Sequence, residues 1–248
     1  MAGSVIVMIE VDLIAKHGKK ALGMEENHSE AKGWRHRLPE ILLEIGIIVF
    51  AITLSIQLHA WHEHSLERAE ERKFLTGLRT DLQSDLKELQ QDSLSYAQLR
   101  RGFRYFRALT PRTFNVDSVH RYQWTLYNST NLLPNTSRFE GLKSAGKLGV
   151  IENDELLNDI LDNYQELIPG LVRTTLNFST YKEQNIQHYL DERLEPSGNN
   201  FLAVMQANPM RNYLNKDIYV KEIVNRYHSV LMQNRKIIRG INAHLAQD

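Results

Sequence analysis

The most prominent feature of the sequence is an apolar run from residue 41 to residue 60, in which Glu44 is the only Asp, Glu, Lys or Arg. At about 1.5 Å per residue, a helix of this length spans the roughly 30 Å hydrocarbon core of a bilayer. The run is apolar on all faces, whereas a helix on a soluble core usually keeps a polar face. Trp34 and Trp61 flank it like the aromatic anchors of a membrane interface. The pattern therefore predicts one transmembrane helix over residues 38–60.

A stripe of apolar residues with helical spacing follows this run. Apolar side chains recur mostly every three or four residues, and no proline lies between Pro39 and Pro111. The transmembrane helix is thus predicted to continue as a long membrane-proximal helix over residues 61–109, with Gly77 and Gly102 tolerated at about 1 kcal/mol each. Because the heptad is not kept over four clean repeats, we expect the stripe to pack on later helices of the same chain, with a parallel coiled coil between protomers as the alternative. The stripe consists of Leu66, Leu75, Leu78, Leu82, Leu86, Leu89, Ser93, Tyr96, Leu99, Phe103 and Phe106.

The remainder of the chain, residues 110–248, is divided by prolines and glycines into segments with helical spacing. No alternating apolar run with a two-residue turn indicates a strand. Asn153 is predicted to cap one helix, and Asp117 or Ser118 to cap another. The predicted fold class is all-α: one N-terminal transmembrane helix continues into a long helix that packs with an extracytoplasmic helical bundle. Helices are expected at residues 118–127, 137–145, 154–168, 170–194, 201–207 and 217–245.

The basic residues on either side of the apolar run predict its orientation. Five Lys or Arg residues lie within about 20 residues before the predicted transmembrane helix, and four lie within the same distance after it. Because cytoplasmic flanks carry the excess of Lys and Arg, residues 1–37 are predicted to form a cytoplasmic N-terminal segment. Residues 61–248 are then extracytoplasmic, which in a Gram-negative cell means periplasmic, and the protein is placed in the inner membrane.

Composition and charge narrow the classes of function. The chain has 248 residues, no cysteine, 30 Lys and Arg and 30 Asp and Glu, which excludes a disulfide-stapled domain, a cysteine zinc site and a cysteine nucleophile. The neutral net charge and the predicted periplasmic location argue against nucleic acid as a partner. The charge is uneven, since residues 100–143 hold 8 basic and 2 acidic side chains and residues 144–193 hold 4 and 9. Neighbouring helices of opposite charge are expected to pack together.

Two groups of charged residues are candidates for binding a ligand or a partner. Arg100, Arg104 and Arg107 share a helical face that suits an anion, a lipid headgroup or an acidic partner. Glu44 is a carboxylate within the apolar run, where it lies near the headgroups or pairs with another membrane helix. Other carboxylates have the spacing of a solvated helix surface, namely Asp154, Glu155, Asp159 and Asp162.

Catalytic and metal-binding candidates are few. His59 and His62 are three residues apart and are weak candidates for a metal site, although they are more simply interpreted as interfacial polar residues. The sequence contains no Gly-x-Ser-x-Gly motif, no phosphate-binding glycine loop and no helical zinc-protease motif. No catalytic residue, metal or cofactor is therefore predicted, and the protein is not expected to be an enzyme.

Residues at the end of the predicted membrane helix and in two later segments of the chain together form one sequence pattern. Its members are Glu44, Gln57, Trp61 and Glu63 at the membrane, Phe74, Leu75, Leu78, Asp81, Leu82 and Asp85 after it, and Phe139, Leu142, Ser144, Gly146, Leu148, Ile151, Asn153, Leu156, Ile160 and Tyr164 further on. Over roughly residues 38–170 the pattern resembles a bacterial family of small single-pass inner-membrane proteins of unknown function. That family usually has asparagines at the exit, where this chain has His59, Ala60 and His62. The resemblance implies topology and helical content, but no activity.

Three hypotheses about function follow from these features. The first is a membrane-anchored, non-enzymatic interaction or scaffold subunit, with the lipid bilayer and either another membrane protein or a second copy as partners. Association would use the membrane helix and the membrane-proximal helix. The second is a sensor-like domain that binds a small molecule in a cavity among residues 118–245. The third is a membrane-bound enzyme, which needs titratable groups converging in a cleft.

Overall fold

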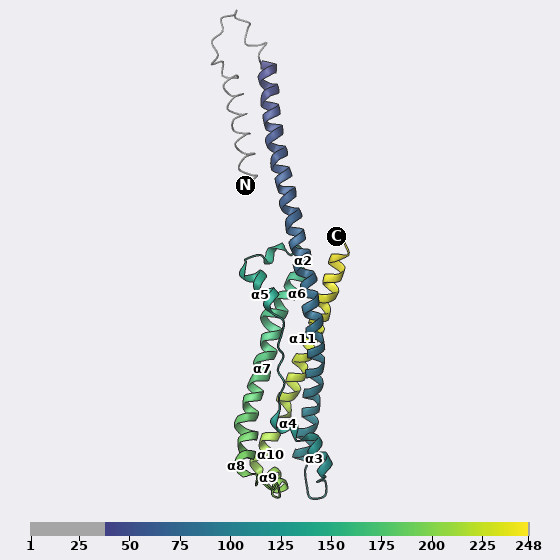
Figure 1. The fold of residues 1–248 in the computed structure, drawn as a ribbon, viewed down its shortest axis with the longest axis vertical. Helices are drawn as coiled ribbons and strands as arrows, with labels where there is room; N and C mark the ends of the chain where they lie inside the picture. The colour runs from purple at the N-terminus through teal and green to yellow at the C-terminus, as the bar shows by residue number, and fades with distance from the viewer. Residues whose placement is uncertain (1–37, 248) are drawn as a thin grey trace, which may run out of the picture. The chain divides into compact units, whose positions relative to one another are not determined.

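The computed structural model describes residues 38–247, and every regular element within this range is a helix (Figure 1). The chain divides into two units, Met1–Leu66 and Glu67–Asp248. Helix α2, Leu38–Arg107, is 70 residues long and contributes residues to both units. The all-helical class and the uninterrupted helix expected as far as about residue 109 are confirmed. The predicted cytoplasmic segment 1–37 and the anchor Trp34 lie outside the described residues.

The first unit contains the apolar part of α2. Its large apolar side chains are exposed from Leu42 to Leu58, and Phe50 is 69% exposed. The Thr53 hydroxyl donates to the carbonyl of Val49 at 2.8 Å, which satisfies this polar group within the helix. Judged by length and composition, α2 is the one helix in the described part of the chain that could cross a membrane.

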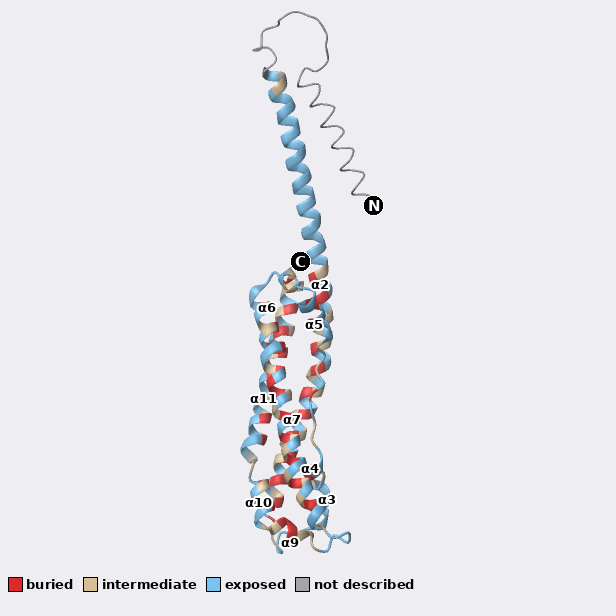
Figure 2. Ribbon diagram, turned by 90° about the vertical axis from the view of Figure 1, so that its left-hand side faces the viewer, coloured by how far each residue is buried: buried red, intermediate tan, exposed pale blue. Residues whose placement is uncertain are grey.

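The second unit is built around three long columns of helix. One is α2 from Glu67 onward, a second runs without a break from residue 154 to residue 193, and the third is α11, Asp217–Leu245. Figure 2 shows buried residues along the inner sides of these columns. The α2 stripe is buried in this core, except for Leu66, Leu86 and Ser93. The second column consists of α6 (Asp154–Leu161), η3 (Asp162–Leu167), α7 (Ile168–Tyr181), η4 (Lys182–Gln187) and α8 (His188–Arg193).

The second column corrects the prediction that a helix ends at Ile168 and another begins at Gly170. The side chain of Asn153 caps α6 as expected, accepting from the N–H of Leu156 at 2.9 Å. The helix then passes through Pro169, because η3 is a π-helical turn in which the N–H of Ile168 reaches back to the carbonyl of Asn163. A wider turn loosens the backbone ladder at the point where proline lacks its donor. Pro169 consequently lies in the first turn of α7.

The short helices differ from the sequence-based prediction in two places. The helix expected at residues 118–127 is two pieces, α3 (Val116–Tyr122) and α4 (Trp124–Tyr127), and its cap is Asn115 rather than Asp117 or Ser118. Helix α10, Asn208–Leu214, was not predicted, because Pro209 was interpreted as a break although proline suits a first turn. The other expected helices are present as α5 (Ser137–Ser144) and α9 (Phe201–Gln206), with a 3-10 turn, η2 (Leu148–Val150), after α5.

The two glycines of α2 in this unit are sites of close approach, not merely tolerated interruptions. A Cβ atom at Gly102 would lie 2.4 Å from Oγ1 of Thr125, a fully buried residue of α4. A Cβ atom at Gly77 would lie 2.3 Å from the guanidinium carbon of Arg138. The absence of a side chain thus lets α4 and α5 pack directly against α2.

Candidate functional site

The site residues predicted near the membrane belong to the first unit. Glu44, His59, Trp61 and His62 are all exposed on α2 within the first unit. Among the described residues, no group of three or more His, Asp or Glu is arranged to hold a metal ion. His59 and His62 lie one helical turn apart on α2. Among the described residues, no third side chain completes a metal site with them.

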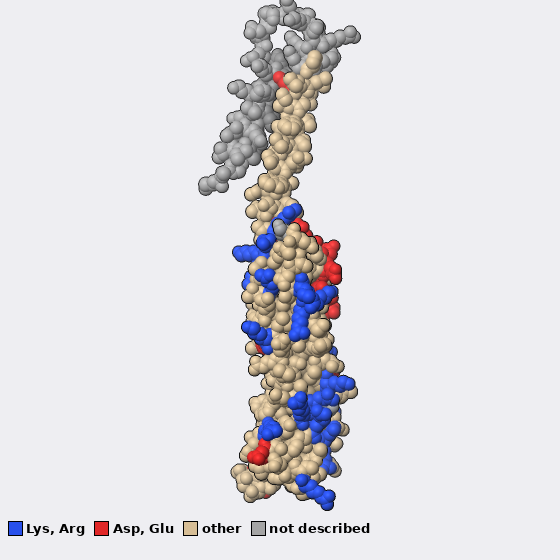
Figure 3. Space-filling view, turned by 90° about the vertical axis from the view of Figure 1, so that its right-hand side faces the viewer, with Lys and Arg blue, Asp and Glu red and all other residues tan. Residues whose placement is uncertain are grey.

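The arginines predicted to form an anion-binding face lie at the C-terminal end of α2. Arg104 and Arg107 are exposed, and Arg100 is half-buried. Arg107 donates to Oδ1 of Asn215 at 2.9 Å, so part of this face tethers the segment before α11. Phe103 lies in the core behind the arginines. Figure 3 shows that Lys and Arg side chains are spread along one face of the second unit.

A row of carboxylates on α2 holds the connecting segment between α4 and α5, a role that the sequence pattern did not predict even though it contains Asp81 and Asp85. Its four members follow the helical spacing of one face and are Asp81, Asp85, Glu88 and Asp92. Glu88 accepts from the N–H of Leu133 at 2.9 Å, and Asp85 accepts from the N–H of Asn135 at 3.2 Å. An extended segment has no ladder partner for its backbone groups, so side chains must satisfy them. The recurrence of carboxylates every three or four residues was the available signal.

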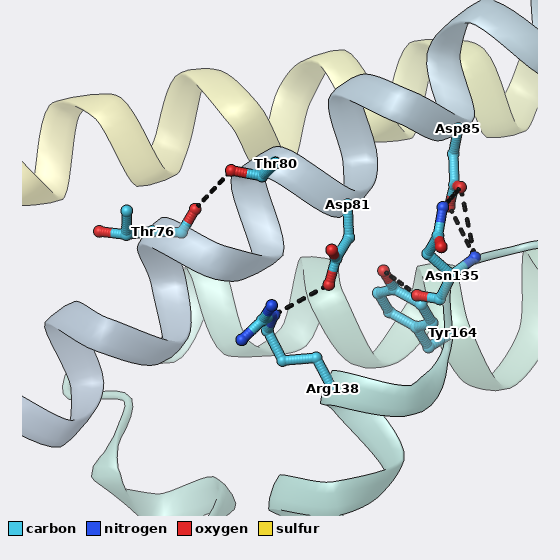
Figure 4. Close-up of polar contacts among 7 residues, drawn as sticks. All are labelled: Thr76, Thr80, Asp81, Asp85, Asn135, Arg138 and Tyr164. Carbon is cyan, nitrogen blue, oxygen red and sulfur yellow. Dashed lines mark hydrogen bonds and ion pairs between the residues drawn. The ribbon is translucent and has the colours of Figure 1, made fainter.

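Asp85 is the most buried carboxylate of this row (Figure 4). It also accepts from the side-chain amide of Asn135, and the backbone carbonyl of Asn135 accepts from the Tyr164 hydroxyl at 3.4 Å. Burial raises the pKa of Asp85, and the hydrogen bonds from Asn135 act in the opposite direction. Beside it, Asp81 pairs with the guanidinium of Arg138 at 2.9 Å. The row therefore anchors both the connecting segment and the start of α5.

Asp92 joins the connecting segment to α11 in the middle of the bundle. One carboxylate oxygen accepts from the hydroxyl of Thr130 at 2.6 Å, and the other accepts from the hydroxyl of Tyr227 at 3.1 Å. The hydroxyl of Tyr96 donates to the carbonyl of Thr130 at 2.7 Å. Burial raises the pKa of both tyrosines, which keeps them protonated as donors. The network connects three elements through a single carboxylate.

Lys182 is a fully buried lysine in η4 that faces the same connecting segment. Its amino group donates to the carbonyl of Asn128, and no carboxylate pairs with it among the described residues. Burial lowers the pKa of Lys182 to about 7, because the charged form loses its hydration. Next to it, Gln187 donates to the carbonyl of Tyr127 at 2.7 Å. Both side chains thus satisfy carbonyls at the C-terminal end of α4.

A buried amide pair links η3 to α11. The side chain of Asn163 donates to Oδ1 of Asn234 at 2.9 Å, and both residues are fully buried. The remaining oxygen of Asn163 and the remaining nitrogen of Asn234 have no partner within the described structure. Such a pair favours one register between neighbouring helices, because sliding either helix would leave both buried amides without a hydrogen-bond partner.

A groove of about 400 Å³ lies between α7 and α11 in the second unit. Its volume lies within the range of small-molecule sites, and its floor contains the buried side chains of Phe178 and Ile223. Lys216 lies at the rim with its amino group 5.6 Å from the ring centre of Tyr219. A smaller hollow of about 110 Å³ is lined by Tyr96 and by residues of the connecting segment.

Comparisons with known proteins leave the family open. No protein-family model, no curated protein and no solved structure matches the chain. The resemblance to small single-pass membrane proteins therefore stays a prediction from the residues that suggested it. The features that bear on function are the exposed apolar part of α2, the carboxylate row, the groove between α7 and α11 and the smaller hollow beside Tyr96.

Proposed function

We propose that the protein is a membrane-anchored, non-enzymatic interaction or scaffold subunit. The observation that carries the proposal is the apolar part of α2, whose side chains are exposed from Leu42 to Leu58. Contiguous apolar surface on this scale is unfavourable in water and is typical of a membrane or partner interface. The lipid bilayer is the first partner in this proposal, and a membrane protein or a second copy is the next.

The polar interior of the second unit supports a binding role over a catalytic one. Asp85, Asp92 and Lys182 are used to satisfy the connecting segment. Groups engaged in this way stabilise a rigid helical body, which suits a scaffold that presents its surfaces. By the positive-inside count, this body lies in the periplasm of a bacterial cell and the N-terminus lies in the cytoplasm.

Photocrosslinking in native membranes tests the proposal. A photoreactive residue at Leu54 probes the apolar part of α2, and one at Gln98 probes the exposed surface of α2 in the second unit. We expect lipid adducts from the first position and defined protein adducts from at least one of the two. A reporter fused after the last residue should be active outside the cytoplasm. A soluble chain, or one that crosslinks to no protein at either position, would contradict the proposal.

The groove between α7 and α11 favours a second candidate function, a sensor-like domain that binds a small molecule. The groove combines the buried ring of Phe178 with the amino group of Lys216 and the carboxylate of Glu222. A ligand that binds the folded state raises the melting temperature, and the rise grows with the logarithm of the free ligand concentration above Kd. Thermal shifts measured on wild type and on Lys216→Ala/Tyr219→Ala distinguish this function, because only the wild type should respond.

A further inference from the structure

The charged side chains of α2 are sorted by face in the second unit. From Arg72 to Arg107 every exposed charged residue of the helix is basic, and no Asp or Glu in this stretch is exposed. We call these residues the basic face: Arg72, Lys73, Lys87, Arg101, Arg104 and Arg107. The carboxylates of the same stretch are the inward row that binds the connecting segment. Because these carboxylates point inward and bind the connecting segment, no acidic side chain of α2 compensates the positive charge on the outer surface of this stretch.

Within residues 38–247, most of the basic face has no ion-pair partner. Arg107 donates to Asn215, whereas the other five residues form no ion pair in the described part of the structure. The face begins beside Glu71 and ends with α2 itself, so it extends over 36 residues, or roughly 54 Å of helix. Uncompensated charge of one sign over this length attracts a surface of the opposite sign.

The column from α6 to α8 carries the opposite charge. Its exposed acidic residues, which we call the acidic face, are Asp154, Glu155, Asp162, Glu166, Glu183, Asp191 and Glu192. Only Arg173 and Arg193 are exposed bases in the same column. Asp159, predicted to be solvated, is instead half-buried and accepts from Lys236 at 2.7 Å. The column spans 40 residues, or about 60 Å, and so matches the basic face in length.

The charged residues of the basic face and those of the acidic face lie at similar positions along the length of the bundle. Glu71 at the start of the basic face accepts from the N–H of Glu152, just before α6, so both faces begin at the same end (Figure 1). At that end Arg72 and Lys73 correspond to the acids of α6 and η3. At the far end the arginines of α2 correspond to the acids of α8. Two parallel copies side by side therefore bring opposite charges together at both ends.

We propose that the basic face of one copy docks on the acidic face of a second copy. The inference rests on the membrane-anchored interaction function proposed above, and it names the partner. A single exposed ion pair contributes little to affinity, so docking needs several pairs at once. Anchoring in one membrane keeps copies parallel and raises their effective concentration. The contact joins two different faces, so it produces rings or rows of copies rather than two-fold dimers.

Energy transfer between labelled copies in vesicles tests the inference. The chain has no cysteine, so Ser197→Cys, on an exposed loop, takes a donor or an acceptor dye at one position. Full-length protein is reconstituted in phosphatidylcholine vesicles, whose lipid carries no net charge. We expect energy transfer above the level of random encounter, and its loss as NaCl rises from about 0.05 M to about 0.5 M, because salt screens exposed charges.

Charge reversal identifies the two faces. Arg101→Glu/Arg104→Glu reverses part of the basic face, and E183R/D191R reverses part of the acidic face. Each variant alone should associate about tenfold more weakly. An equal mixture of the two should recover association, because each reversed face then meets a matching partner.

Control variants separate the effect from total charge and from misfolding. Arg112→Glu/Arg121→Glu makes the same change of charge at exposed residues outside both faces and should leave association unchanged. Arg101→Gln/Arg104→Gln provides a milder version if the reversal disturbs the circular dichroism spectrum, and it should still weaken association.

Several outcomes would overturn the inference. They are a wild type without energy transfer, association insensitive to both salt and reversal, and reversed variants that do not recover on mixing. If the wild type stays monomeric in vesicles but crosslinks to another protein in native membranes, the interaction function stands and docking between copies is wrong. If neither result is obtained, both proposals fail.

Discussion

The buried amino group of Lys182 leads to a specific prediction about pH and stability. Desolvation lowers the pKa of Lys182 from 10.5 to about 7, and the amino group donates to the carbonyl of Asn128. Lys182→Met keeps an unbranched apolar stem and removes the titrating group. We predict that the free energy of unfolding of the wild type, measured relative to this variant, rises as the pH increases above neutrality.

The magnitude follows from the difference between the folded and unfolded pKa values. Between about pH 7 and about pH 9 the unfolded chain keeps the proton on Lys182, whereas the folded chain releases it. The unfolded state then binds more protons, so stability rises with pH in this window. At about 1.4 kcal/mol per pH unit, and with the folded amine about half protonated at the start, the gain is about 2 kcal/mol. Below about pH 6 the amine is charged in both states, and this group contributes no slope.

Chemical denaturation followed by circular dichroism in mixed micelles measures this difference at several pH values. The matched control is Lys221→Met, which removes a lysine from the exposed side of α11. We expect this control to change the free energy of unfolding little, because the side chain of Lys221 is exposed. A difference for Lys182→Met that stays constant or falls with pH would refute the argument that burial depresses this amine.

Two further predictions concern packing and buried polar groups. Gly102→Ala should lower the free energy of unfolding by about 1–3 kcal/mol, because its Cβ meets the short buried side chain of Thr125. Gly77→Ala should cost less, since it meets the end of a flexible arginine, and thermal denaturation compares the two. Asn234→Leu should cost about 1–3 kcal/mol by leaving the amide of Asn163 without a partner. Replacing both asparagines by leucine should recover much of this loss, which a double-mutant cycle measures.

Local patterns were sufficient to predict most helices of this protein. The α2 stripe and the cap at Asn153 are read from neighbours three or four residues apart, and both are present in the structure. Pro169 and Pro209 were misinterpreted as breaks for a shared reason. Whether a proline starts, interrupts or merely loosens a helix depends on where the preceding turn places its carbonyls. The presence of a proline in the sequence does not reveal the geometry of that turn.

The candidate sites were less predictable than the helices. Arg104 follows from the helical spacing of the arginines and is exposed, and its binding role stays a prediction. Lys182 was overlooked, because a lysine at a helical position is ordinarily solvated. Asp92 was overlooked for the same reason, although it connects the segment after α4 to Tyr227 on α11.

The sequence by itself determined the properties that depend on near neighbours: the apolar run, the helical class and the helical spacing of charges. The tertiary structure decided which face of each helix is covered. On α2 the extended segment between α4 and α5 lies against Asp85 and Asp92, so the acids turn inward and the bases are left outside. The spacing of charged residues along a helix specifies the angle of each side chain around the helix axis. Only the position of the neighbouring chain determines which angles face water, and that position arises from contacts tens of residues apart.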